Sequence, residues 1–117
     1  MTSKELALEI VKVLDEKKAL DIKVIEINEL TIIADYFVIA SGTSSTHTKA
    51  LAEDVDFNLG KQGVNPVSQE GRATGWILMD YGAVLVHVFQ KETREYYNLE
   101  RLWSDAAVLD LSEIVKE

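Results

Sequence analysis

The residue types that most suggest chemistry are a glycine turn and two carboxylates that follow it. Gly42 and Thr43 form a turn of the kind that holds phosphate, and Asp54 and Asp56 lie one residue apart further along the chain. Enzymes that transfer nucleotidyl groups combine such a turn with such a carboxylate pair, which binds the divalent metal ions of the reaction. Metal-dependent nucleotidyl transfer is therefore the first chemistry to weigh.

The expected local structure argues against this chemistry. Asp54 and Asp56 fall among apolar residues at helical spacing, namely Leu51, Ala52, Val55 and Leu59. Alternate residues point to one side of a strand, but on a helix they lie about 200° apart. We therefore expect two solvated helix carboxylates. We also expect hydroxyls of residues 41–45 to cap the helix, with anion binding at its N-terminus as the less favoured alternative.

The rest of the chain offers little else for catalysis. It has no cysteine, and its two histidines, His47 and His87, lie on different expected elements without the paired spacing of metal ligands. Stacking beside Trp76 and a hydrogen bond to a nearby polar group account for a histidine at position 87 of a strand. We expect no catalytic residue, no metal and no cofactor.

Composition bounds the class of protein. The chain has 117 residues, 47% hydrophobic and 27% charged, which is normal for one folded domain over residues 1–117. The 20 acidic and 12 basic side chains give a net charge of -8. This charge disfavours nucleic acid as a partner and favours a basic protein surface. No segment has the pattern of a leader or a membrane span, so we expect a cytoplasmic protein without membrane contact.

Apolar periodicity predicts the elements. Thr2 with Glu5 can form a capping box for a first helix, whose apolar residues recur from Leu6 and which ends near Lys18. A second helix is expected after Ser45, ending near Gly60 and Gly63, and one or two short helices within Lys91–Trp103. From Ala106 onward, the apolar residues of the tail either pack on the body or fray.

Five segments read as strands. Asp21–Ile27 is rich in β-branched residues, Tyr36–Ala40 is apolar on both faces and so predicted to be central, and Pro66–Glu70 suits an edge. Gly75–Asp80 and Ala83–Phe89 are predicted to form a hairpin. A two-residue loop would place Asp80 opposite Ala83. The prediction is an α+β fold with one sheet flanked by helices.

The two faces of the hairpin differ in kind. One face is wholly apolar and should be covered by helices, with Ile77, Met79, Val84, Val86 and Val88 on it. The other mixes aromatic, apolar and polar groups, as partner-binding surfaces do, and carries Trp76, Leu78, Asp80, Leu85, His87 and Phe89. Trp76, Tyr96, Tyr97 and Trp103 are of the residue types enriched at protein interfaces. The residues therefore favour a binding module over an enzyme.

Several segments in matched order and spacing resemble ribosomal silencing factor, the Iojap family. They are Ala34–Ile39, Ser41–Ser45, Glu70-Gly71, Trp76–Gly82, Val86–Phe89 and Arg94–Trp103. The resemblance covers nearly the whole chain, and the segment Trp76–Gly82 joined to the Tyr-Tyr-Asn-Leu-Glu block is its most specific part. Thr46-His47 departs from the basic residue of many relatives, which puts a phosphate or RNA contact of this turn in doubt.

The resemblance implies a function that composition does not show. Members of the family bind the fourteenth protein of the large ribosomal subunit, ribosomal protein L14, and block joining of the small subunit, so that translation is silenced when nutrients run short. It implies a mixed sheet flanked by helices, related to nucleotidyltransferases but without their catalytic carboxylates. It also implies a possible homodimer of the free protein, whose surface sequence cannot place.

The family's interface carries over onto matching positions of this chain. The resemblance implies that the contact with the ribosomal protein is made by Glu70, Trp76, Met79, Asp80, Tyr81, Tyr96, Tyr97, Leu99 and Trp103. Aromatic side chains would anchor the partner, and carboxylates would meet its lysine or arginine residues.

Overall fold

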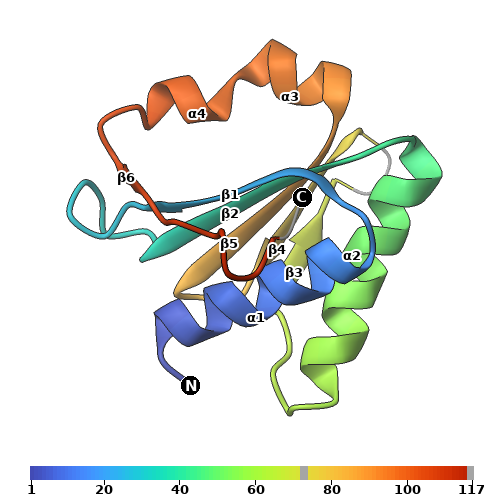
Figure 1. The fold of residues 1–117 in the computed structure, drawn as a ribbon, viewed down its shortest axis with the longest axis horizontal. Helices are drawn as coiled ribbons and strands as arrows, with labels where there is room; N and C mark the ends of the chain where they lie inside the picture. Colours follow the sequence, from blue (N-terminus) through green and yellow to red (C-terminus); the bar gives the residue numbers. More distant parts are fainter. Residues whose placement is uncertain (72–73, 116–117) are drawn as a thin grey trace.

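In the part of the chain that the structure describes, six strands form one mixed sheet with helices on both faces (Figure 1). The computed structural model describes residues 1–71 and 74–115. The elements follow the chain in the order α1 (Ser3–Glu16), β1 (Leu20–Glu26), β2 (Tyr36–Gly42), α2 (Ser45–Gly60), β3 (Ser68–Glu70), β4 (Trp76–Asp80), β5 (Val84–Gln90), α3 (Lys91–Tyr97), α4 (Leu99–Leu102) and β6 (Ala107–Val108).

The sheet order is β3-β4-β5-β2-β1-β6. β2 pairs with β5 in parallel, and the other neighbouring strands are antiparallel. The predicted α+β fold with a single mixed sheet is therefore confirmed, as are the central position of β2 and the edge position of β3. β6, in the tail, was not predicted, and the other elements begin and end within about two residues of their expected bounds.

The apolar face of the hairpin is covered by α1 and α2, as predicted. These helices lie together on one side of the sheet (Figure 1). The inward residues Ile77, Val86 and Val88 are buried there with Leu14 and Leu51. The apolar residues of the tail, Leu109, Leu111, Ile114 and Val115, pack against the same core, so the tail packs on the body. None of the described helices is long and apolar enough to cross a membrane.

The mixed face is covered in part by the protein's own helices. α3 and α4 cross the sheet on the side opposite α1 and α2 (Figure 1). A second, smaller core forms beneath them, in which Phe37, Ile39 and Phe89 are buried with Leu99 of α4. The mixed face, which was expected to meet a partner, is thus partly covered by α3 and α4. The part that stays exposed lies around these two helices.

The register of the hairpin differs from the expectation. Asp80 lies opposite Leu85 instead of Ala83, and Trp76 lies opposite Phe89 instead of His87, a shift of two residues. The turn is longer because the carboxylate of Asp80 accepts the Gly82 N–H at 2.7 Å. The carbonyl of Val84 accepts the Tyr81 N–H at 3.0 Å. A shift of two residues leaves every side chain on its predicted face, because the side-chain period of a strand is two.

Gly42 ends β2 where the chain turns into α2, and close packing explains its presence. A β-carbon at this position would stand 2.5 Å from Thr48 Oγ1 and 2.8 Å from the Thr48 backbone nitrogen. Thr48 is buried, and its hydroxyl donates to the carbonyl of Ser44 at 2.8 Å. The threonine therefore has no room to move away from a larger residue.

We predict that Gly42→Ala destabilises the protein by about 1 to 3 kcal/mol, because overpacking forces the start of α2 away from the strand. Urea denaturation measures the loss. Gly60→Ala is the matched control, since its added β-carbon meets Asn65 Oδ1 at an ordinary 3.5 Å. Equal stability of the two variants would mean that packing does not select the glycine.

Candidate functional site

The carboxylates that first suggested chemistry do not form a metal site. Asp54 and Asp56 lie in the middle of α2, as expected, on different sides of the helix. Among residues 1–71 and 74–115, no three histidine, aspartate or glutamate side chains are grouped so that they could hold a metal ion.

The polar groups of the glycine turn bond to one another. The Thr43 N–H donates to His47 Nδ1 at 2.9 Å, and the His47 N–H donates to Ser44 Oγ at 3.1 Å. The other ring nitrogen of His47 donates to the carbonyl of Lys17 at 2.9 Å, just after α1 ends. Ser44 therefore caps α2, which confirms the predicted cap, and His47 joins α2 to the end of α1.

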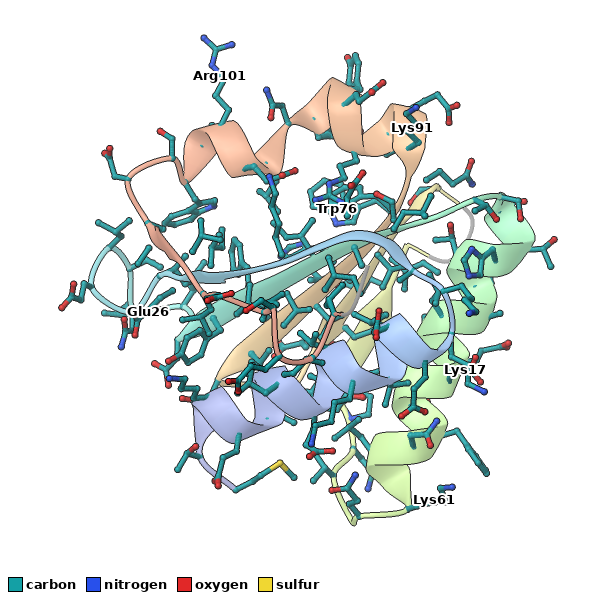
Figure 2. The ribbon with its side chains drawn as sticks, in the orientation of Figure 1. Lys17, Glu26, Lys61, Trp76, Lys91 and Arg101 are labelled. Atoms are coloured by element: carbon teal, nitrogen blue, oxygen red, sulfur yellow. The ribbon has the colours of Figure 1, made fainter. Side chains whose placement is uncertain are left out.

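A run of aromatic rings begins on the opposite face of the sheet and continues onto α3. The Trp76 ring centroid lies 5.0 Å from that of Phe89 and 5.0 Å from that of Tyr97, which in turn lies 5.0 Å from that of Tyr96. Tyr96 is 81% exposed and Tyr97 52% exposed, while Trp76 is partly exposed. Figure 2 labels Trp76 between the sheet and α3. We call Trp76, Tyr96 and Tyr97 the aromatic surface.

The polar end of Trp76 points into the protein. Its indole N–H donates to His87 Nδ1 at 3.1 Å. Burial lowers the pKa of His87 from 6.5 to about 4, so the ring is neutral near pH 7. A partner would therefore meet the ring of Trp76 and not its N–H group.

A left-handed residue sets the corner between α3 and α4. Asn98 ends α3 with φ 47° and ψ 54°, a conformation that asparagine tolerates better than most residues. Its backbone N–H donates to the carbonyl of Arg94 at 2.9 Å. The chain then turns into α4, whose first residue, Leu99, is buried against the sheet.

An ion pair joins the two short helices to each other and to the sheet. The Arg94 side chain donates to both carboxylate oxygens of Glu100, at 3.0 and 3.3 Å, and to Ser41 Oγ of β2 at 2.9 Å. Lys23 of β1 donates to the same carboxylate at 2.9 Å. Hydrogen bonds from Arg94 and Lys23 hold the pKa of Glu100 below its ordinary 4.5, against the opposing effect of burial. Arg94 itself is buried.

The structure brings most of the predicted interface residues to one side of the sheet. Strand register places Glu70 of β3 and Asp80 of β4 on the face of Trp76. Leu99 is buried beneath α4, and the ring of Trp103 packs edge-on against Phe37 at 5.4 Å. Leu99 and Trp103 therefore hold α4 on the sheet, whereas Tyr96 and Tyr97 are exposed on α3.

Two predicted interface residues lie on the other side. Met79 is fully buried in the core beneath α1 and α2, so its side chain does not reach the surface in this structure. Tyr81 is buried on that side too, where burial and the charge of Asp56 raise the pKa of its phenol. The alternation of β4 explains this, because Met79 stands between two residues of the opposite face.

Arg94 and Glu100 were not among the predicted site residues. They are separated by six positions and lie on two helices, and Ser41 lies 53 positions from Arg94. No periodic pattern in the sequence connects such residues. Leu102 was missed as well, and it is exposed on α4.

Comparison with known proteins identifies the family. The family model described as "Ribosomal silencing factor during starvation" matches residues 1–117. The chain belongs to the ribosomal silencing factor family. It is 40% identical to the ribosomal silencing factor of Bacillus subtilis (strain 168) over 98 residues, which are 83% of each chain. It is 36% identical to that of Halalkalibacterium halodurans over 116 residues, 98% of this chain and 99% of the relative.

Solved structures and an organellar relative agree with this membership. A crystal structure of a Chromobacterium violaceum protein, 34% identical, superposes with a TM-score of 0.86 over 89% of this chain and 88% of that one. The mouse protein named "Mitochondrial assembly of ribosomal large subunit protein 1" is 36% identical over 99 residues, 81% of this chain and 43% of its own. The resemblance to the silencing factor family is confirmed.

The buried histidine predicts an acid-dependent loss of stability. The unfolded chain takes up a proton near pH 6.5, but folded His87 does so only near pH 4. The free energy of unfolding therefore falls as pH drops through this window, by roughly 3 kcal/mol in total from this group. His87→Phe lacks the titrating group and controls for the carboxylates. We expect the stability of the wild type relative to this variant to fall between pH 7 and pH 4 in urea denaturation; a constant difference would contradict the assignment.

The Arg94–Glu100 pair predicts a second stability effect. Glu100→Gln leaves a buried guanidinium without its charged partner, so we expect the free energy of unfolding to fall by roughly 2 to 3 kcal/mol. Glu9→Gln is the matched control, since Glu9 pairs with Lys12 on the exposed side of α1 at 3.2 Å. That change should cost under about 1 kcal/mol. If the two variants lose the same amount of stability in denaturant titrations, the Arg94–Glu100 pair does not hold α3 and α4 in place.

Proposed function

We propose that this protein binds the large ribosomal subunit through ribosomal protein L14 and thereby prevents the small subunit from joining. Translation is repressed as a result, chiefly under nutrient limitation. The mechanism is steric: the bound protein occupies the subunit-joining face, and no covalent bond is made or broken. The strength of silencing then depends on occupancy and residence time.

The observation that carries this proposal is the aromatic surface. Exposed Tyr96 and Tyr97 continue a row of rings that is anchored in the second core, and these residue types dominate binding energy at protein interfaces. Exposed carboxylates of Glu92 and Glu95 lie on the same helix. The net charge of -8 favours a basic partner. A basic ribosomal protein meets both requirements.

The relatives support the same partner class. The family description names silencing during starvation, and the mouse relative is named for assembly of the large ribosomal subunit. We infer that the chain acts in the cytoplasm, where bacterial ribosomes are found. The residues that we assign to the contact are Trp76, Tyr96 and Tyr97, with Glu70 and Asp80 as charged contributors on the same face. Leu99 and Trp103 support this surface from within. Met79 and Tyr81 belong to the core on the other side of the sheet.

Co-sedimentation with separated ribosomal subunits tests the proposal directly. We expect the protein to sediment with large subunits alone and to reduce the amount of joined ribosomes on a sucrose gradient as its concentration rises. Binding should weaken with added salt, because charge attraction contributes to it. A protein that sediments with neither subunit, or with small subunits only, would contradict the proposed function.

Tyr96→Ala tests the surface without disturbing the fold. Because Tyr96 is 81% exposed, we expect unchanged thermal stability and a loss of large-subunit affinity of at least ~2 kcal/mol. Phe57→Ala is the matched control: Phe57 is an aromatic residue of α2 that is 66% exposed on the opposite side of the sheet. Equal affinities of the two variants would remove Tyr96 from the interface. Trp76→Ala is less selective, because Trp76 also packs on Phe89.

A further inference from the structure

The hydrogen bond between Trp76 and His87 lies directly behind the aromatic surface. The indole N–H of Trp76 on β4 donates to His87 Nδ1 on β5 at 3.1 Å. The two residues are diagonal neighbours on one face of the sheet, since His87 lies opposite Leu78 and Trp76 lies opposite Phe89. Because Nδ1 accepts this bond, the neutral ring carries its proton on Nε2.

This arrangement has a cost in stability. His87 is only 4% exposed, and its ring lies 4.6 Å from that of Phe37 and 6.2 Å from that of Phe89. Its Nε2 is buried and has no hydrogen-bond partner among the described residues. A buried N–H group without an acceptor costs free energy, which an apolar ring at this position would avoid. Phenylalanine would leave the indole N–H of Trp76 without this acceptor, but the partly exposed indole can turn that group to water. Stability alone therefore does not call for histidine here.

What the histidine provides is one acceptor aimed at Trp76. The indole is partly exposed, and its ring centroid lies 5.0 Å from that of Phe89 and 5.0 Å from that of Tyr97. The terminal torsion of a tryptophan is intrinsically broad, so the orientation of the indole depends on its contacts. A directed N–H···N bond selects the orientation in which the polar edge points inward and the opposite edge points outward.

We propose that His87 is a positioning residue of the binding surface, holding the indole of Trp76 in its binding orientation through Nδ1 at the expense of fold stability. This inference rests on the proposed function, because it assumes that the aromatic surface binds a partner. It adds His87, which no partner touches, to the residues on which binding depends. It also gives a role to a buried group that the fold does not require.

Two variants separate positioning from packing. His87→Phe keeps a ring in the cluster and removes the acceptor, so the variant should melt at or above the wild-type temperature and bind large subunits about tenfold more weakly. A tenfold loss of affinity follows if the indole of Trp76 occupies its binding orientation about one tenth of the time in this variant. His87→Asn removes the ring but keeps an acceptor two bonds from Cβ, as Nδ1 is. The His87→Asn variant should melt at a lower temperature than His87→Phe and bind large subunits more tightly.

The decisive result is that His87→Phe is the more stable of the two variants, whereas His87→Asn binds large subunits more tightly. A purely structural role of His87 predicts the same order in both measurements, and that outcome would overturn the proposal. A cycle with Trp76→Phe adds a second test. Adding His87→Phe to the Trp76→Phe variant should weaken binding no further, because the donor is already absent. A further tenfold loss in that background would show that His87 acts through another residue.

The bond itself is observable without a ribosome. The chain has two tryptophans, and the indole ¹H–¹⁵N resonance that remains in a Trp103→Phe variant belongs to Trp76. We expect this resonance to lie downfield and to exchange slowly with water, and to lose both properties when His87→Phe is added. An unchanged resonance would overturn the proposal.

Failure of the inference and failure of the proposed function give different results. If the wild type binds no large subunit, the proposed function fails, and the role of His87 in binding fails with it whatever the resonance shows. If the wild type and His87→Phe bind equally well, the proposed function stands and only the positioning role of His87 is overturned.

Discussion

Both faces of the sheet need cover, because the residues of β2 from Tyr36 to Gly42 are all buried. Tyr36, Val38 and Ala40 belong to the core beneath α1 and α2, while Phe37 and Ile39 belong to the core beneath α3 and α4. Two long helices supply the first layer. The second layer must come from the short segment after β5, and the position of the aromatic surface depends on how that segment is held.

The two layers are stabilised by different forces. The first is an apolar core of mostly aliphatic side chains, which excludes water over a large area. The second is smaller, and α3 and α4 are each too short to be stable by themselves. Leu99 and Trp103 pack them on the sheet, and the Arg94–Glu100 pair with Ser41 and Lys23 fixes their position. Directional polar contacts thus determine where the tyrosines project.

Periodicity predicted most of the fold. The apolar run of β2 indicated its central place, and the alternation of β4 and β5 assigned each side chain to the correct face. It did not fix the hairpin register, because a shift of two residues changes no face. The same alternation had placed Met79 on the apolar face, whereas the family resemblance carried it into the interface with its neighbours. The buried position of Met79 shows that local pattern was the better guide there. The Arg94 contacts were beyond sequence reasoning, since they depend on tertiary packing between distant positions.

The sheet ends in very short strands. β3 has three residues and β6 has two, so each outermost strand itself exposes few unpaired backbone groups, although β6 pairs only with Ile25 and Glu26 of the seven-residue β1. Long, flat edges let other chains add as extra strands, which leads to aggregation. Truncated edges make that mode of association unfavourable, even though the central strands are rich in valine, isoleucine and phenylalanine. We therefore expect its recognition of other molecules to rely on side chains more than on backbone pairing.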